Sequence, residues 1–147
     1  MSGDITNGVY DRLNSILTGK PKKIFLMVGI NDLARGKSND EIANGIHNII
    51  KKIKRESPMT ALHIMSILPV TSYYNKFNGH TSKWERVARI NKQIKNICLA
   101  EKIIYIDLYR YFADKEGKMQ IQYTNDGLHL MGNGYALWRK IIEPYVN

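Results

Sequence analysis

The sequence predicts an α/β protein in which helices cover both faces of a parallel sheet. Segments with helical spacing alternate with short apolar runs along the whole chain. The run at residues 24–30 has no polar side chain, which is typical of a strand that is covered on both faces. No segment repeats, and no stretch of the 147 residues is rich in Pro, Ser or Gly, so we expect a single domain over residues 1–147.

Four helices are expected from apolar residues that recur on one helical face. The first is stopped by Gly19 and Pro21. The second has Ser38 or Asn39 as its N-cap, a stripe of isoleucines along one face, and Pro58 after its end. The expected helices cover residues 5–17, 39–55, 82–101 and 133–145.

Three strands alternate with these helices. Because each pair of strands is joined through a helix, the strands are expected to run parallel. In such sheets ligands bind at the carboxyl ends of the strands, so we expect functional residues just after Gly29, Leu68 and Leu108. The expected strands cover residues 22–29, 62–68 and 103–108.

The first of these strands is expected to lie at an uncovered edge of the sheet. A fully apolar strand such as residues 24–28 is rarely left open in this way. The chain also begins with a helix, although a sheet of this kind needs a strand to seed it. We therefore expect that further strands precede this sequence, and that the chain by itself forms a homo-oligomer through the edge at residues 24–28.

Composition limits the classes of partner. There are 22 Lys and Arg against 13 Asp and Glu, a formal net charge of +9. The basic stretch at residues 51–55 falls on the solvated side of an expected helix and has no recognition motif, so no nucleic-acid partner is expected. The longest apolar run is far shorter than the roughly 18 residues that span a bilayer, so no membrane span is expected. No secretory signal opens the chain, which leaves a cytoplasmic location as the default.

The strongest local signal follows the first expected strand. Residues 29–32, Gly-Ile-Asn-Asp, place the side-chain amide of Asn31 at the carboxyl end of that strand. This amide can donate a hydrogen bond to an oxyanion that develops during a reaction. The alternative is that Asn31 and Asp32 only form a turn or cap a short helix.

A second signal is the segment Asp126-Gly127-Leu128-His129. A carboxylate three residues before an imidazole can bend back to accept a hydrogen bond from Nδ1, which leaves Nε2 to act as a base. Each part also has an ordinary interpretation, because Asp-Gly is a common turn and a single His is usually structural. Together with Asn31, the pair favours catalysis more strongly than either motif does alone.

These motifs resemble those of the SGNH hydrolases, also called GDSL-like lipases or esterases, and within them the platelet-activating-factor acetylhydrolase type. Residues 2–6, Ser-Gly-Asp-Ile-Thr, look like the family block whose glycine donates a backbone N–H to the oxyanion, which makes Gly3 a candidate donor. Residues 29–32 look like the block whose Asn is the other donor, which implies that role for Asn31.

The segment that ends in His129 resembles the family block that supplies the general base, with Asp126 as its partner. The resemblance covers essentially the whole chain. It implies a flavodoxin-like, three-layer αβα fold with a parallel sheet, whose N-terminal strands are missing from this chain. It also implies hydrolysis of an acyl or acetyl ester by a Ser-His-Asp mechanism, without a metal or another cofactor. The implied substrate is a small-molecule ester, either an acyl lipid or an acetylated sugar.

The sequence departs from the family in one block. The family's nucleophilic serine belongs to a Gly-Asp-Ser block on a strand upstream of the glycine block, and these 147 residues contain no such block. Ser2 lies beside the candidate donor Gly3 rather than on such a strand, and we interpret Ser66 and Ser72 as structural. This chain alone is therefore expected to be nearly inactive. The alternative is a non-catalytic binding module that retains the fold.

The loop after the second strand supplies further candidates. Its aromatic residues Tyr73, Tyr74 and Phe77 either line the substrate pocket or pack on their own scaffold. Asn91, on the third expected helix, is a candidate for substrate binding, with an ordinary helix-surface role as the alternative. The other histidines lack the spacing of metal ligands, so no metal site is expected. They are His47, His63 and His80.

Overall fold

The computed structural model describes residues 5–147 and has the alternating order of helices and strands that the sequence predicts. Its strands are β1 (Lys23–Leu26), β2 (Ala61–Met65) and β3 (Ile104–Ile106). The long helices are α1 (Thr6–Thr18), α3 (Asn39–Glu56), α5 (Trp84–Glu101) and α7 (Gly132–Val146). The short helices are α2 (Ile30–Ala34), α4 (Asn78–Thr81), α6 (Tyr109–Phe112) and the 3-10 helix η1 (Ile121–Tyr123).

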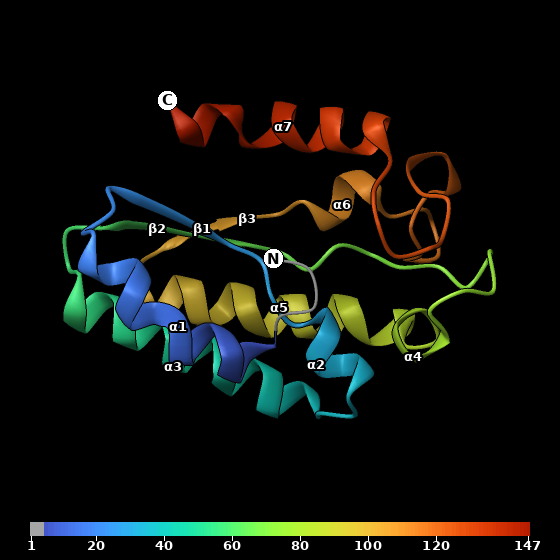
Figure 1. Cartoon of the computed structure of the whole chain (residues 1–147). Helices are drawn as coiled ribbons and strands as arrows, with labels where there is room; N and C mark the ends of the chain where they lie inside the picture. Colours follow the sequence, from blue (N-terminus) through green and yellow to red (C-terminus); the bar gives the residue numbers. More distant parts are fainter. Residues whose placement is uncertain (1–4) are drawn as a thin grey trace.

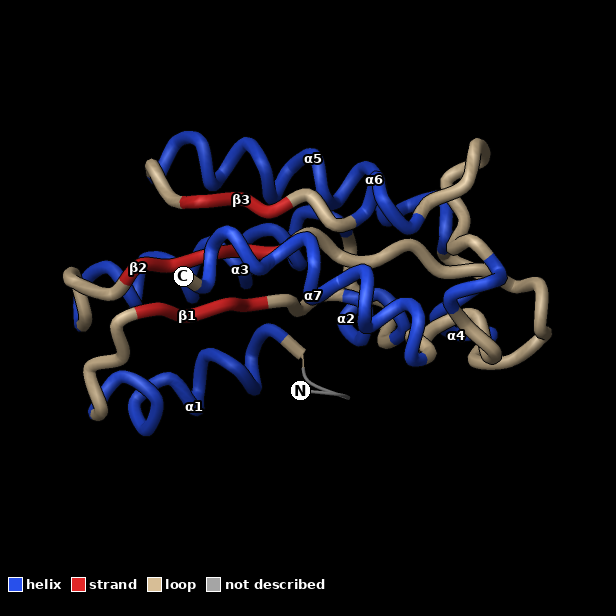
Figure 2. Tube along the Cα trace, turned by 90° about the horizontal axis from the view of Figure 1, so that it is seen from above, coloured by secondary structure: helices blue, strands red, loops and turns tan. Residues whose placement is uncertain are grey.

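The strands form a parallel sheet in the order β1-β2-β3. Ile24 of β1 lies opposite Leu62, and His63 of β2 lies opposite Ile104. Helices lie on both sides of this sheet, which confirms the expected three-layer α/β arrangement (Figure 1). Figure 2 shows β1 at one side of the sheet with α1 next to it. Within residues 5–147, the outer edge of β1 therefore has no partner strand.

One face of the sheet is covered by α1, α3 and α5 (Figure 1). Helix α3 is capped by Ser38, whose Oγ accepts a hydrogen bond from the Glu41 N–H at 3.1 Å, while the Ser38 N–H donates to the Glu41 carboxylate at 3.0 Å. This reciprocal cap satisfies two backbone donors at the start of the helix. The isoleucine stripe of α3 is buried in a continuous apolar core, as the sequence predicts: Ile42, Ile46, Ile49, Ile50 and Ile53.

The opposite face is covered mainly by α7 (Figure 1). The last turn of α7 is attached to the start of β1, because Lys23 Nζ donates to the carbonyl oxygens of Tyr145 and Val146 at 2.9 and 2.8 Å. A basic side chain at a helix C-terminus satisfies carbonyls that have no partner within the helix. A second and smaller apolar core lies on this side: Met65, Ile106, Leu108, Phe112, Met119 and Ile142.

The strands are shorter than the sequence predicts. Strand β2 ends at Met65 rather than at residue 68, because the backbone of Ile67 pairs with a side chain instead of a neighbouring strand. That side chain is Asn91, which accepts from the Ile67 N–H at 2.8 Å and donates to the Ile67 carbonyl at 2.9 Å. The short helices α4 and α6 have too few residues to show an apolar period, so the sequence does not reveal them, and it offers α2 only as the alternative for Asn31 and Asp32.

Strand β1 is less buried than an apolar run covered on both faces would be. Ile24, Phe25 and Leu26 are only half-buried, whereas four residues of β2 are buried. Both faces of β1 are nevertheless packed, since Ile24 and Leu26 lie against the larger core and Phe25 lies against the smaller one. The partial exposure agrees with the position of β1 at the open edge of the described sheet, as the sequence predicts. Among residues 5–147, no helix is both long and apolar enough to cross a membrane.

Candidate active site

The chain turns sharply after β1 and so brings Asn31 into the first turn of α2. The turn depends on Gly29, whose φ of +133° is rarely adopted by residues with a side chain. A Cβ atom at this position would lie 2.7 Å from the Cδ1 atom of Ile67. Both the conformation and the close packing therefore require glycine before Asn31.

The neighbouring Asp32 ties this loop to the start of α1. Its carboxylate is fully buried and accepts from the Thr6 N–H at 3.1 and 3.2 Å and from the Thr6 hydroxyl at 2.7 Å. Lys37 Nζ lies 3.5 Å from the same carboxylate. The candidate donor Gly3 and the alternative nucleophile Ser2 lie outside the described residues. The hydrogen bonds from Thr6 to Asp32 hold the start of α1 next to the loop that contains Asn31.

The segment before α7 pairs Asp126 with His129 as expected. One carboxylate oxygen of Asp126 lies 2.8 Å from His129 Nδ1, and the other accepts the backbone N–H groups of Leu128 and His129, each at 2.8 Å. Burial alone raises the pKa of this carboxyl, but the hydrogen bonds from His129 and Leu128 outweigh burial and lower the pKa to about 2. Asp126 is therefore ionised at neutral pH and holds the imidazole with Nε2 directed away from the carboxylate.

Two loops are joined at this point. The Thr71 N–H, after β2, donates to the carbonyl oxygen of Gly127 at 2.9 Å. Gly127 has a φ of +90°, and a Cβ atom there would collide with the Thr71 carbonyl oxygen. The glycine between Asp126 and His129 thus lets the two loops approach each other, which fixes the position of His129 relative to the sheet.

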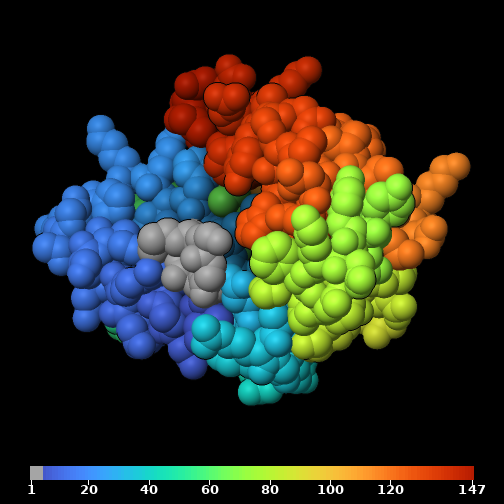
Figure 3. Space-filling model, turned by 45° about the vertical axis from the view of Figure 1, so that its right-hand side comes forward, coloured from blue at the N-terminus to red at the C-terminus, as the bar shows by residue number. Residues whose placement is uncertain are grey.

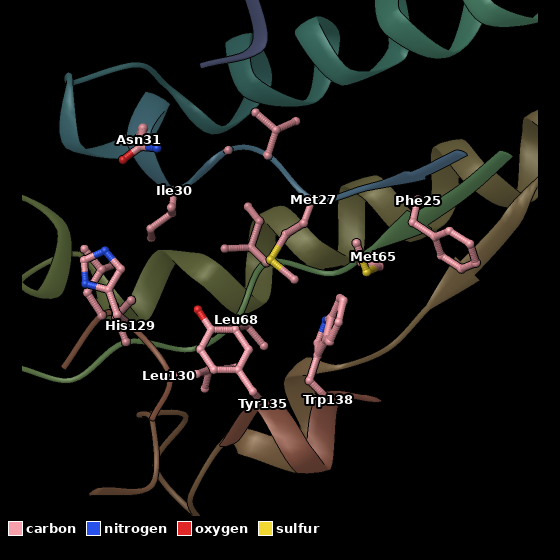
Figure 4. A pocket seen from close by; sticks show the side chains of 15 residues that line it. Phe25, Met27, Ile30, Asn31, Met65, Leu68, His129, Leu130, Tyr135 and Trp138 are labelled. Atoms are coloured by element: carbon pink, nitrogen blue, oxygen red, sulfur yellow. The ribbon is translucent and has the colours of Figure 1, made fainter. Parts of the chain in front are cut away.

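Asn31 and His129 line the same cavity, which has a volume of about 370 Å³. Figure 4 shows these two side chains at one end of the cavity, and Phe25 and Trp138 at the other. Most of the remaining lining is apolar. In Figure 3 the surface is hollowed where the segment that includes β1, the segment before α7 and the loop after β2 meet. The arrangement places the amide of Asn31 and the imidazole of His129 together near the carboxyl ends of the strands.

The structure adds His80 to this site, which the sequence does not single out. His80 Nε2 lies 2.8 Å from Asn31 Oδ1, and Phe77 contacts the rings of both His80 and His129 edge to face. Burial lowers the pKa of His80, and the charges of His129 and Lys83 lower it further. The only signal in the sequence is that His80 belongs to the loop whose aromatic residues are expected near the site.

Other predicted substrate contacts are not brought to the cavity. Tyr73 is 68% exposed, and the Tyr74 hydroxyl donates to the carbonyl oxygen of Ile121. Asn91 is buried and bonded at both ends to the backbone of Ile67, so it supports the segment that lines the cavity and does not itself reach it. Of Tyr73, Tyr74 and Phe77, Phe77 is the one whose ring contacts a candidate catalytic residue, His129.

The described serines do not supply a nucleophile at the cavity. Ser66 is fully buried, and its hydroxyl accepts the N–H groups of Leu108 and Tyr109, each at 2.9 Å. Ser72 is exposed in the loop after β2. Among residues 5–147, none of those that line the cavity is Ser, Thr or Cys. The same part of the chain contains no group of three or more His, Cys, Asp or Glu placed to hold a metal ion.

Comparisons with known proteins find relatives along nearly the whole chain. The sequence profile of the GDSL-like Lipase/Acylhydrolase family matches residues 1–137. The alpha2 subunit of platelet-activating factor acetylhydrolase IB from Rattus norvegicus is 27% identical over an alignment of 147 positions, which covers 98% of this chain and 59% of that protein. The chain therefore spans about three fifths of the length of this relative.

Two solved structures have the same fold. One, from Streptococcus pneumonia and named after platelet activating factor, has a TM-score of 0.86 and 26% identity over 99% of this chain and 69% of its own. The other, a GDSL-like lipase from Bacteroides thetaiotaomicron, also has a TM-score of 0.86, with 20% identity over 99% of this chain and 72% of its own.

Proposed function

The chain belongs to the GDSL-like lipase/acylhydrolase family, and we propose that it forms the base and oxyanion part of the active site of a serine ester hydrolase. One observation carries the proposal. The Asp126–His129 pair and the Asn31 amide come from segments far apart in the sequence and meet at one end of the same cavity. An acyl-transfer site needs such a base and such a donor around one reacting carbonyl.

In the proposed mechanism His129 is the general base. Its Nε2 accepts the proton of the attacking serine hydroxyl, and the resulting imidazolium then donates that proton to the leaving alcohol. Asp126 accepts the Nδ1 hydrogen at 2.8 Å, which holds the ring and stabilises its positive charge. The low pKa of Asp126 supports this role, because a partner of imidazolium must stay ionised throughout the reaction.

The tetrahedral intermediate carries a negative oxygen, and we assign its stabilisation to Asn31 and Gly3. The Asn31 side chain supplies an N–H donor from the first turn of α2, and Gly3 supplies its backbone N–H, as the family resemblance implies. Donors that are already held in place need no reorganisation when the charge develops. The buried clasp between Asp32 and Thr6 supports this arrangement, because it joins the start of α1 to the loop of Asn31.

We propose that the nucleophilic serine belongs to a segment that pairs with the outer edge of β1. The sequence has no Gly-Asp-Ser block, and Ser66 is bonded elsewhere. A strand on that edge would cover the half-buried Ile24 and Leu26, and its carboxyl end would lie beside Asn31. Self-association of the chain through the same edge stays a prediction. Sedimentation velocity tests it, and a monomer would contradict it.

The names of the relatives support a proposal for the substrate class. The matched subunit is named as an acetylhydrolase, and we propose that this protein hydrolyses esters of acetyl or other short acyl groups on a small molecule. The apolar lining near Met27 and Leu68 is compatible with an acyl group beside the polar end of the cavity.

The experiment uses the protein expressed from the complete reading frame that contains these residues. Hydrolysis of p-nitrophenyl acetate is measured for the wild type, for His129→Ala and for the control His47→Ala, which removes a histidine paired with Glu101 on a distant helix. We expect His129→Ala to lower kcat by roughly 10⁴-fold to 10⁶-fold and the control to retain activity.

A fluorophosphonate probe completes this experiment. In the protein expressed from the complete reading frame, we expect the probe to label a serine other than Ser66 and Ser72. We expect the 147-residue chain by itself to stay unlabelled. A folded protein that neither hydrolyses the ester nor reacts with the probe would contradict the proposal and favour a binding module. Labelling of the short chain at Ser2 would contradict the proposed source of the nucleophile.

A further inference from the structure

His80 contacts the proposed oxyanion donor from outside the cavity. It lies in α4, which packs against α2, and its Nε2 atom is 2.8 Å from Asn31 Oδ1. His80 is not among the residues that line the cavity, so it reaches the reacting atoms only through Asn31. The proposed catalytic pair does not use it.

The chemistry of the two groups decides the direction of this hydrogen bond. The oxygen of a side-chain amide can only accept, so His80 must carry its hydrogen on Nε2 and donate it to Asn31. An amide is planar, with its oxygen and its NH₂ group on opposite branches. A donor that holds the oxygen therefore also fixes the direction of the NH₂ group. If the amide turned over, its oxygen would face the oxyanion and repel it.

We propose that His80 is a positioning residue that holds the Asn31 amide with its NH₂ group toward the oxyanion. The proposal rests on the proposed ester hydrolysis, because only that reaction places an anion at Asn31. It goes beyond the catalytic pair and the two donors, since it assigns a function to the turn that contains α4. His80 performs no proton transfer in this assignment and acts by restricting one rotatable bond of Asn31.

The charge state of His80 suits this role. Burial, the neighbouring His129 and the Lys83 ammonium all lower the pKa of His80, so its ring is neutral near pH 7. A neutral ring with its hydrogen on Nε2 donates to Asn31 without adding a second positive charge beside the base. The effect of His129 on the pKa of His80 comes from its imidazolium charge, so this part of the lowering acts while His129 holds the proton during the reaction.

Phe77 connects His80 to the base. Its ring meets the His80 ring at 6.2 Å and the His129 ring at 5.3 Å between centroids, edge to face in both cases. Phe77 has a φ of 52°, which is uncommon for a residue with a large side chain. Its carbonyl oxygen accepts the N–H groups of His80 and Thr81, each at 2.8 Å. These bonds hold the turn in the conformation that places Phe77 between the two imidazoles.

The test compares variants that separate the hydrogen bond from the packing. His80→Phe keeps a flat ring but removes the donor, whereas His80→Gln places an N–H donor at the same number of bonds from the backbone. His47→Phe is the matched control on α3. Two quantities are measured: the side-chain NH₂ resonances of Asn31 by NMR in the 147-residue chain, and kcat and KM for p-nitrophenyl acetate in the protein from the complete reading frame.

We expect His80→Phe to shift or broaden the Asn31 NH₂ resonances and to lower kcat by about 10-fold to 100-fold with KM unchanged, since loss of a whole oxyanion donor costs about 10²-fold to 10³-fold. His80→Gln should restore both quantities, and His47→Phe should change neither. Wild-type resonances and kcat in His80→Phe would overturn the inference, as would equal losses in His80→Phe and His80→Gln. If the wild-type protein hydrolyses no ester, the proposed function fails, and the NMR comparison alone decides whether His80 orients Asn31.

Discussion

The two faces of the sheet differ in how completely they are packed. On one face, α1, α3 and α5 enclose a continuous core in which Ile46 and Ile50 have at most 1% of their surface exposed. On the other face, α7 leaves Phe25 of β1 half-buried, and Phe25 lines a cavity of about 370 Å³. The densely packed face therefore supplies most of the rigidity of the fold, and the open face presents the candidate catalytic groups on loops.

The polar groups of the two faces differ in the same way. Asn91, on the packed side, uses both ends of its amide to satisfy the backbone of Ile67. Asn31, beside the cavity, has its amide oxygen held by another side chain, His80. The Asn91 amide stabilises the backbone of the fold, whereas the Asn31 amide is oriented by a neighbouring side chain. The contrast teaches that the same residue type has a structural or a chemical role according to what its oxygen and its NH₂ group face.

The largest effect on stability is expected from the packed face. Ile50→Ala should lower the free energy of unfolding by roughly 2 to 5 kcal/mol, because it leaves a cavity in a closed core. Phe25→Ala, on half-buried β1 and packed against the smaller core under α7, should cost only about 1 kcal/mol in the 147-residue chain. Urea denaturation measures both. Equal losses would contradict the difference between the faces, and a larger loss for Phe25→Ala in a longer protein would show that another segment covers β1.

Substitutions on the open face should change catalytic activity more than stability. Asn31→Ala is expected to lower kcat by about 10²-fold to 10³-fold, since it removes a proposed donor to the oxyanion. Its control is Asn44→Ala, an exposed position on α3. Steady-state kinetics on a short ester tests this, and an unchanged kcat in folded Asn31→Ala protein would remove Asn31 from the mechanism.

Asn91 provides the matching test on the packed side. Asn91→Leu leaves the buried N–H and carbonyl of Ile67 without partners, which should cost about 1 to 3 kcal/mol of folding free energy for each group. KM for the ester should stay unchanged, because Asn91 does not line the cavity. Thermal unfolding and kinetics measure the two effects. A raised KM with normal stability would instead support direct contact with substrate.

The smallest expected effect is a loss of folding stability at acidic pH. The pKa of Asp126 is about 2 in the folded protein, below the ordinary value of about 3.9 for an aspartate in an unfolded chain. Its contribution to stability is therefore complete above about pH 4 and is lost as the pH falls toward 2. The difference in unfolding free energy between the wild type and Asp126→Asn should shrink over this range. A difference that stays constant from pH 5 to about pH 2 would contradict the assigned ionisation.

Local patterns account for what could be predicted. The stripe of isoleucines in α3, the cap at Ser38 and the pairing of Asp126 with His129 all join residues within a few turns of each other. The short helices α4 and α6 could not be predicted, because four residues are too few to show a period. The extent to which residues 24–26 are buried could not be predicted either, since burial depends on what lies beside a strand.

By itself, the sequence determined the order of helices and strands, the parallel sheet and the internal geometry of each site motif. Only the tertiary structure decided that Asn31 and His129 share a cavity, that His80 contacts Asn31 and that Asn91 serves the backbone of Ile67. The physical reason is distance along the chain. His80 and Asn31 are separated by 49 positions, and a contact of that kind is set by how the layers pack rather than by any local preference.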